Sequence, residues 1–200
     1  MDNSESLSYC GESVARHAAR LINRLDRLAR AADHRDGLNP AQRDALRYLA
    51  LANRFSRSPA AFADYLGTTR GTVSQSLIAL EAKGYVTREP HPRDRRAVAL
   101  GLTAAGRAAL KDDDGAALLA EAVAAGAGAE AATLARLLEA TLAAAIARNG
   151  GRAFGICRTC RHFRAEAHAG TARPHHCALL DVPLAEADSG AICVEHERAA

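Results

Sequence analysis

The chain has 200 residues, a formal net charge of +3, 48% hydrophobic residues and 24% charged residues. These proportions are typical of a soluble globular protein, and the length suits one main domain with a small addition. No apolar run reaches the roughly 18 residues of a membrane span, and the first residues lack the basic and apolar segments of a signal peptide, so we expect a cytoplasmic protein with no membrane partner.

The positive charge is concentrated between residues 40 and 100, which hold ten Lys and Arg against five Asp and Glu. A basic segment of this kind is typical of a protein that binds a polyanion. An evenly solvated basic face gives the same count, so charge alone leaves both interpretations open.

A first helix is predicted from about Val14 to Ala32. Apolar residues recur there at steps of four and three positions, at Val14, Ala18, Leu21, Leu25, Leu28 and Ala32. This heptad spacing favours packing against another helix, either in the same chain or in a second copy. The segment that contains Gly37 and Pro40 is expected to end the helix.

Two shorter helices follow, and each has a start signal. Asn39, Pro40 and Gln42 predict an N-cap, a first-turn proline and a capping-box partner. Ser58-Pro59 repeats the signal, and Gly67 is expected to end the third helix.

A fourth helix is predicted to start after Thr68 or Thr69 and to end at Gly84. Its apolar face carries Val73, Leu77 and Leu80, whereas the opposite face is small and polar. A short helix, a turn and this longer helix have the pattern of a helix-turn-helix. The β-type runs "YVTREP" and "AVALGLT" then flank "HPRDRR", which predicts a hairpin whose charged tip can reach DNA phosphates or the minor groove.

The stretch from about Gly67 to Gly106 resembles the MarR family of winged-helix transcriptional regulators. The resemblance lies in "LEAKGYVTR", then "DRR", then "LTAAG", which have the order and spacing of that family's motifs. It implies a mainly α fold of the α+β class, with a winged helix-turn-helix over about 38–104 inside a DNA-binding and dimerisation domain of residues 1–149. It extends more loosely from the first helix to about Arg148.

The same resemblance implies a sequence-specific regulator, expected to be a repressor, that binds a pseudo-palindromic double-stranded DNA operator as a homodimer. Thr68 to Ser76 would enter the major groove. Asp94 would help to hold the arginines of the wing, and Arg96 would reach the minor groove. The candidate DNA-binding residues are Thr68, Thr69, Arg70, Gly71, Thr72, Ser74, Gln75, Ser76, Arg93, Asp94, Arg95 and Arg96.

Two more helices are expected after the hairpin. Thr103 is predicted to cap a helix that bends around "KDDDG" and runs to about Ala125. The last helix, over 130–148, carries a stripe at Leu134, Leu137, Leu138, Leu142 and Ile146. In MarR-like proteins the first and last helices build the dimer, although packing within one subunit would give the same stripe. Some relatives bind small acids near these helices, so a small-molecule effector stays an option, but no residue marks its pocket.

Residues 150–200 form a separate cysteine-rich tail after the flexible joint Asn149-Gly150-Gly151. The pair Cys157 and Cys160 places two sulfurs on one tight turn, and Cys177 and Cys193 follow at intervals that let loops fold back. In a reducing cytosol, clustered cysteines bind metals more often than they form structural disulfides. The tail has few large apolar residues, so metal ligation would supply stability that its core lacks.

The sequence leaves the identity of the metal open. Zn²⁺ is the first expectation, with four cysteine ligands or with His196, His175 or His176 as alternative ligands. The alternative is an iron–sulfur cluster, [4Fe–4S] or [2Fe–2S], because the cysteine order resembles that of high-potential iron–sulfur proteins, although no tryptophan stands near the last cysteine. A zinc ion would stabilise the fold of the tail, whereas a cluster could act as a sensor of iron, oxygen or redox state.

No catalytic pattern is present: the sequence has no Ser/His/Asp arrangement, phosphate-binding glycine loop or His-Glu-x-x-His motif, so we do not expect an enzyme. Two other classes of protein remain possible from the sequence. One is a redox protein that uses the winged fold for docking, and the other is a protein-interaction module whose tail recruits a partner. Cys10, the fifth cysteine, is expected to be an inert thiol rather than a peroxide sensor.

Overall fold

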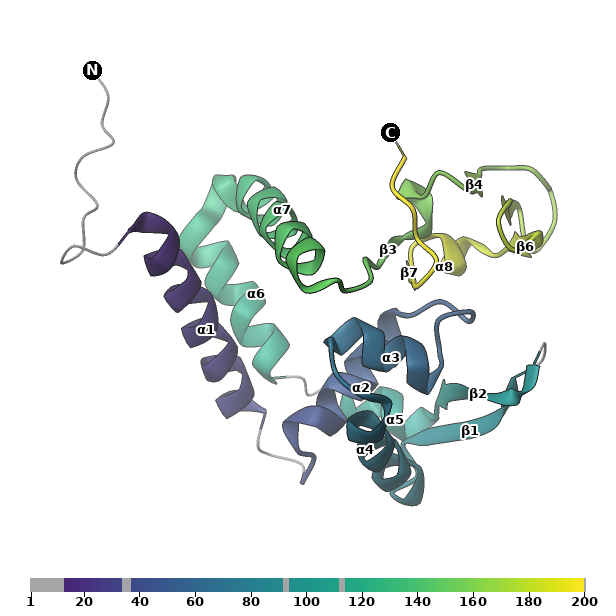
Figure 1. Ribbon diagram of the computed structural model, residues 1–200, viewed down its shortest axis with the longest axis horizontal. Helices are drawn as coiled ribbons and strands as arrows, with labels where there is room; N and C mark the ends of the chain where they lie inside the picture. The colour runs from purple at the N-terminus through teal and green to yellow at the C-terminus, as the bar shows by residue number, and fades with distance from the viewer. Residues whose placement is uncertain (1–12, 34–36, 92–93, 112–113, 200) are drawn as a thin grey trace.

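The computed structural model describes residues 13–33, 37–91, 94–111 and 114–199, and the side chains of residues 91–97 are not described. Cys10 and Arg93 therefore lie outside the described residues. The chain has three parts, which are a set of long helices, a winged-helix part and a tail of short strands (Figure 1). This mainly helical architecture confirms the expected fold class.

The long helices are α1 (Val14–Ala32), α6 (Asp114–Ala127) and α7 (Ala131–Asn149), with a short 3-10 turn, η1 (Gly128–Glu130), between the last two. Helices α1 and α6 lie side by side, and α7 folds back next to α6 (Figure 1). Gly150 follows α7 with φ of +64°, a left-handed conformation that ends the helix and turns the chain toward the tail.

The winged-helix part contains α2 (Pro40–Leu51), α3 (Pro59–Leu66), α4 (Arg70–Ala82) and α5 (Ala104–Ala109), with the hairpin β1 (Val86–His91) and β2 (Asp94–Leu102). The predicted caps are confirmed. Asn39 and Gln42 form a capping box, and Ser58, Thr69 and Thr103 each accept a hydrogen bond from the main chain of the helix that follows.

The core of the chain lies inside the winged-helix part. Val73, Leu77 and Leu80 are at most 3% exposed, so the predicted apolar face of α4 is confirmed. These side chains pack with buried residues of α2, α3 and both strands, namely Leu46, Tyr48, Leu49, Phe62, Val86 and Leu100. Burial of this face fixes which side of α4 points outward.

The tail is built from very short elements. Its strands are β3 (Gly155–Ile156), β4 (Phe163–Arg164), β5 (His175–Cys177), β6 (Val182–Leu184) and β7 (Ile192–Cys193), and its helices are the 3-10 turn η2 (Cys157–Thr159) and α8 (Glu186–Ser189). Strand β3 pairs with β7, and β4, β5 and β6 form a second antiparallel sheet. Pairing of β3 with β7 closes the tail on itself, which brings its first and last cysteines close together.

In the described part of the chain, one candidate segment within 104–149 is long and apolar enough to cross a membrane by length and composition. It is weak evidence of a span, because the stretch is divided among α5, α6, η1 and α7. None of its apolar window is buried within the chain.

Candidate functional site

Helix α4 presents its polar N-terminal half to solvent. Its N-cap is Thr69, whose hydroxyl oxygen accepts a hydrogen bond from the N–H of Thr72 at 3.2 Å and also lies 2.9 Å from the Thr72 hydroxyl. Six of the eight predicted contact residues between positions 68 and 76 are exposed: Thr68, Thr69, Arg70, Gly71, Thr72 and Gln75. Ser74 and Ser76 are half-buried. The outward surface of α4 is therefore small, polar and free to enter a groove.

Lys83 of the "LEAKGYVTR" motif and Thr103 of the "LTAAG" motif hold α4 in place. The ammonium group of Lys83 donates hydrogen bonds to the carbonyl oxygen of Gly37 at 2.9 Å and to Oε1 of Gln42 at 3.1 Å, which joins the end of α4 to the start of α2. The hydroxyl of Thr103 donates to the carbonyl of Gly84 at 2.8 Å. These two contacts fix the helix between α2 and the end of the hairpin.

The hairpin follows α4 and projects from the winged-helix part (Figure 1). Its strands pair antiparallel from Val86 opposite Leu102 to His91 opposite Asp94, with an irregularity between Pro90 and His91. Asp94, Arg95 and Arg96 lie at the start of β2, at the tip end of the hairpin, and their side chains are outside the described residues. Their roles at DNA stay predictions.

All four cysteines of the tail line one cavity. We call it the cysteine cavity; its volume is about 20 Å³, which is room for about one water-sized group. Its lining consists of Cys157, Cys160, Cys177 and Cys193 together with His162, Phe163, Leu179, Leu184 and Glu195. The sulfurs come from η2, from Cys160 directly after it, from β5 and from β7, so the fold gathers residues that are up to 36 positions apart in sequence.

The cysteine sulfurs receive hydrogen bonds from outside the cavity. The side-chain amide of Asn53 donates to Sγ of Cys157 at 3.4 Å, and the N–H of Glu197 donates to Sγ of Cys160 at 3.5 Å. A hydrogen bond between the Cys157 and Cys193 thiols lowers the pKa of Cys193 to about 6 and, together with burial, raises the pKa of Cys157. Thiolate character on Cys193 suits a ligand sulfur.

The three alternative histidine ligands do not line the cysteine cavity. Nε2 of His196 lies 3.0 Å from the Thr159 hydroxyl, and the His196 ring packs on Gly155. Nε2 of His175 lies 2.6 Å from a carboxylate oxygen of Glu186, and His176 lies within 3.3 Å of Asp181. The histidine that does reach the cavity is His162, which the sequence did not single out.

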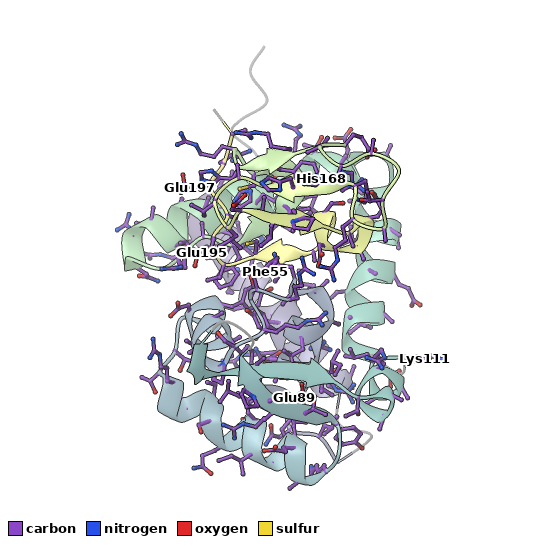
Figure 2. The ribbon with its side chains drawn as sticks, turned by 90° about the vertical axis from the view of Figure 1, so that its right-hand side faces the viewer. Phe55, Glu89, Lys111, His168, Glu195 and Glu197 are labelled. Carbon is purple, nitrogen blue, oxygen red and sulfur yellow. The ribbon has the colours of Figure 1, made fainter. Side chains whose placement is uncertain are left out.

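The tail docks on the residues between α2 and α3. We call residues 52–58 the α2–α3 turn. The N–H of Asn53 donates to the carbonyl of Ile192 at 2.9 Å, and the N–H of Val194 donates to the hydroxyl of Ser56 at 2.9 Å. Asn53 and Ser56 are at most 2% exposed, so these contacts are buried. Phe55 of this turn lies at the level where the tail meets the winged-helix part, below Glu195 (Figure 2).

Aromatic rings and charges extend this junction. Phe154 makes edge contacts with the rings of Tyr48 and Tyr65 at centroid distances of 6.3 and 5.2 Å. A guanidinium nitrogen of Arg54 donates to the carbonyl of Pro183 at 2.6 Å. In Figure 1 the tail lies on the side of α3 that faces away from α4, so the junction leaves the outward face of α4 uncovered.

Sequence reasoning missed Asn53 and Ser56. They lie 104 residues from Cys157 and 138 residues from Val194, and each stands in an ordinary polar loop pattern after α2. No motif or periodicity marks them, because their partners come from a different part of the chain. The wing is coupled to the same turn, since the N–H of Leu100 donates to the carbonyl of Arg57 at 2.8 Å.

Residues 36–97 match the MarR family. Wild-type MarR of E. coli is similar in structure, with 27% identity and a TM-score of 0.53 over 66% of this chain and 98% of that one. A MarR transcriptional regulator of Methanosarcina mazei Go1 shares the fold at 20% identity, with a TM-score of 0.57 over 65% of this chain and 96% of that one. So does CouR of Rhodococcus jostii RHA1 bound to p-coumaroyl-CoA, at 20% identity and a TM-score of 0.54 over 66% of this chain and 90% of that one.

A search of curated proteins gave no match. The family match covers the helix-turn-helix and most of the hairpin, which are the elements that the quoted motifs occupy. The likeness to E. coli MarR covers almost all of that protein. The chain therefore contains a segment that matches the MarR family, within a winged-helix fold similar to that of E. coli MarR.

Proposed function

We propose that this protein is a cytoplasmic, homodimeric, sequence-specific DNA-binding repressor. The observation that carries the proposal is the polar, exposed N-terminal half of α4, held outward by the burial of Val73, Leu77 and Leu80. Thr68 to Ser76 would read base edges in the major groove, and Arg96 at the start of β2 would contact the minor groove.

The exposed apolar faces of the long helices support the homodimer. Leu21, Leu25 and Leu28 of α1 are 47%, 44% and 50% exposed, and Leu137 and Leu142 of α7 are 60% and 61% exposed. Exposed leucines that recur along one helix favour an interface with another chain. A second copy that covers both helices would place two α4 helices on two half-sites of a pseudo-palindrome.

A small-molecule effector is part of the proposal. The structure of CouR contains p-coumaroyl-CoA, and a ligand that favours one spacing of two α4 helices would shift the affinity of a dimer for DNA. Screening of organic acids for an effect on operator affinity tests this element separately from DNA binding itself.

DNA binding is tested with double-stranded DNA from the region upstream of the protein's own gene, together with selection from random duplexes. Arg70→Ala and Gln75→Ala remove exposed groups of α4, and we expect each to weaken specific binding at least tenfold while the fold is retained. Arg136→Ala removes a charge from α7 and is the matched control, expected to bind as the unchanged chain does. Fluorescence anisotropy over a salt series measures both effects.

Two outcomes would contradict this function. Selection from random duplexes that enriches no sequence would exclude specific recognition. Equal affinities for the Arg70→Ala, Gln75→Ala and unchanged chains would show that α4 does not contact the DNA, and the winged fold would then be a docking module for a protein partner.

A further inference from the structure

Four cysteine side chains meet at one small space in the tail. Cys157 and Cys160 come from the turn at η2, Cys177 comes from β5 and Cys193 from β7, and all four line the cysteine cavity. Its volume of about 20 Å³ is the size of one water-sized group. The space therefore suits a single ion, whereas several iron and sulfide atoms would fit only if the sulfurs moved apart.

A buried amide is aimed at two of the sulfurs. The side-chain oxygen of Asn53 accepts hydrogen bonds from the N–H groups of Phe55 and Ser56, each at 3.0 Å, so the nitrogen of this amide must point the other way. That nitrogen donates to Sγ of Cys157 at 3.4 Å and also to the sulfur of Cys193. Because Asn53 is 2% exposed, the sulfurs are the partners on which these donors depend.

Main-chain N–H groups reach the sulfurs as well. The N–H of Glu195 donates to the sulfur of Cys193, and the N–H of Glu197 donates to Sγ of Cys160 at 3.5 Å. A neutral thiol is a weak acceptor, whereas a thiolate is the form in which cysteine binds a metal. Donors that converge on ligand sulfurs in this way stabilise the negative charge of a metal–thiolate centre.

The main chain forms tight turns on both sides of the cavity. The N–H of Cys160 donates to the carbonyl of Cys157 at 3.0 Å, and the N–H of His196 donates in the same pattern to the carbonyl of Cys193 at 3.4 Å. Pairing of β3 with β7 places Gly155 opposite Cys193, which brings the two turns together. The fold thus directs ligand sulfurs from both ends of the tail to one point.

Zinc binding requires the sulfurs to close on the ion. A sulfur that touches a water-sized sphere lies about 3.2 Å from the centre of that sphere, and a zinc–sulfur bond is about 2.3 Å long. Among the described residues, no three His, Cys, Asp or Glu side chains stand close enough together to hold an ion. The sulfurs must therefore move inward by about 1 Å, a distance that rotation about the Cα–Cβ bond of cysteine covers.

The cavity is joined directly to the winged-helix part. The N–H of Asn53 donates to the carbonyl of Ile192, the residue before Cys193. The hydroxyl of Ser56 accepts from Val194, the residue after Cys193. An ion that holds Cys193 would therefore also hold the two residues through which the tail docks on the α2–α3 turn.

We propose that Cys157, Cys160, Cys177 and Cys193 bind one zinc ion in the cysteine cavity, and that the ion holds the tail in its folded shape against the α2–α3 turn. The four thiols release their protons on binding and coordinate the ion as thiolates. The tail has few large apolar side chains, so metal ligation stabilises a unit whose own core is small. This proposal does not depend on the proposed DNA-binding function.

The first experiment measures the metal content of the full chain, purified with a reductant and without a metal-affinity column. We expect about one zinc ion per chain and no visible absorption. Cys177→Ser should lose the zinc, and Cys10→Ser, which changes the cysteine outside the tail, should keep it. If the chain is purified without metal, titration with Zn²⁺ replaces the first measurement.

The metal content of the unchanged chain decides the site by itself, so a cysteine variant that fails to fold does not weaken the test. Bound iron with inorganic sulfide overturns the proposal. So does a chain that takes up no zinc in the titration, or one whose tail cysteines are found paired in disulfides under reducing conditions.

The ligand set is tested with Co²⁺ in place of zinc, because cobalt bound by thiolates has sulfur-to-metal charge-transfer absorption. His162 also lines the cavity, so His162→Ala separates four cysteine ligands from three cysteines and this histidine. We expect His162→Ala to keep the cobalt spectrum and Cys177→Ser to lose it. The reverse result would contradict the four-cysteine set.

Asn53→Asp tests the donors that surround the sulfurs. The substitution keeps the oxygen that accepts from Phe55 and Ser56, but it replaces the N–H donors with a carboxylate oxygen that faces the sulfurs. We expect zinc affinity to fall 10- to 100-fold. Thr159→Ala, whose hydroxyl bonds to Ile156 and His196, is the control and should keep the affinity of the unchanged chain. Equal affinities for both variants would exclude a role for the Asn53 amide.

The second experiment follows hydrogen exchange of the unchanged chain before and after zinc is removed by a chelator. We expect exchange to become at least tenfold faster in residues 52–58 and 191–195 and to slow again when zinc is restored. Residues 73–80, in the core around α4, are the internal control and should keep their rate. Unchanged exchange at the junction overturns the second half of the proposal and leaves the zinc site standing.

Discussion

Asp33 and Arg47 form an ion pair in which Nη2 of Arg47 donates to both carboxylate oxygens of Asp33 at 2.9 Å. The same carboxylate accepts a hydrogen bond from the N–H of Gly115 at 3.0 Å and lies 3.7 Å from Nε of Arg43. Asp33 is 3% exposed and Arg43 is 1% exposed. One buried carboxylate therefore joins the end of α1, the middle of α2 and the start of α6.

Asp33→Asn should lower the free energy of unfolding by about 3–5 kcal/mol, because it removes the charge of a buried carboxylate that pairs with Arg47 and lies beside Arg43. Urea unfolding followed by circular dichroism measures the change. Asp26→Asn removes an exposed carboxylate that pairs with Arg30 on α1, and its cost should stay below about 1 kcal/mol. Equal losses in the free energy of unfolding for the two substitutions would show that the burial of Asp33 adds nothing to its contribution to stability.

Gly106→Ala should destabilise the winged-helix part by about 1–3 kcal/mol. A methyl group at this position would overlap the carbonyl oxygen of Tyr85, which belongs to the main chain and cannot move aside without distorting the hairpin. Gly126→Ala is the matched control, because no atom lies within 4 Å of the added group and the position is in helix α6. There we expect stabilisation of about 0.5–1 kcal/mol, and thermal unfolding compares the two variants.

Leu142→Glu should convert the proposed dimer to a monomer. Leu142 is 61% exposed on α7, and a second copy would have to bury the new carboxylate against apolar side chains. Leu51→Glu changes a leucine of α2 that is 53% exposed and should leave the oligomeric state unchanged. Analytical ultracentrifugation measures the oligomeric state of both variants and of the unchanged chain. A monomer for the unchanged chain would contradict the proposed dimer and its two-fold recognition of an operator.

Phe154→Ala should loosen the junction between tail and winged-helix part. The ring contacts Tyr48 and Tyr65, and its loss should expose the nearby peptide bond after Arg152 to trypsin. We expect limited proteolysis to cut there several times faster than in the unchanged chain. Ile156→Ala removes a side chain that is already 43% exposed and should leave the rate unchanged.

Much of the fold could be predicted because its signals are local. Asn39 with Gln42 and Ser58 with Pro59 start the helix next to them, and Gly67 ends the helix before it, so neighbouring residues are enough to predict where each helix starts or ends. The apolar face of α4 is also local, because the spacing of Val73, Leu77 and Leu80 follows from the pitch of the helix. The motif residues Lys83 and Gly106 turned out to have structural partners, which explains why these residue types recur at fixed spacing.

The candidate site could be predicted only in part. The sequence grouped the four cysteines, but the size of the space between them depends on how β3, β5 and β7 are placed, which no spacing rule determines. His196 looked like a ligand because it stands three positions after Cys193, yet its ring packs on Gly155 instead. Asn53 and Ser56 were missed for the opposite reason, since their partners are over a hundred residues away.

The route of the chain after Gly150 has a mechanical consequence. Two chain segments, one after α1 and one after α5, join the long helices to the winged-helix part. With these two connections alone, the winged-helix part could still rotate about the line between them. The tail leaves α7 and adds a third attachment, through the hydrogen bonds of Ile192 with Asn53 and of Val194 with Ser56. We expect this attachment to limit rotation of the winged-helix part against the long helices, so that a large rotation would require these hydrogen bonds to break.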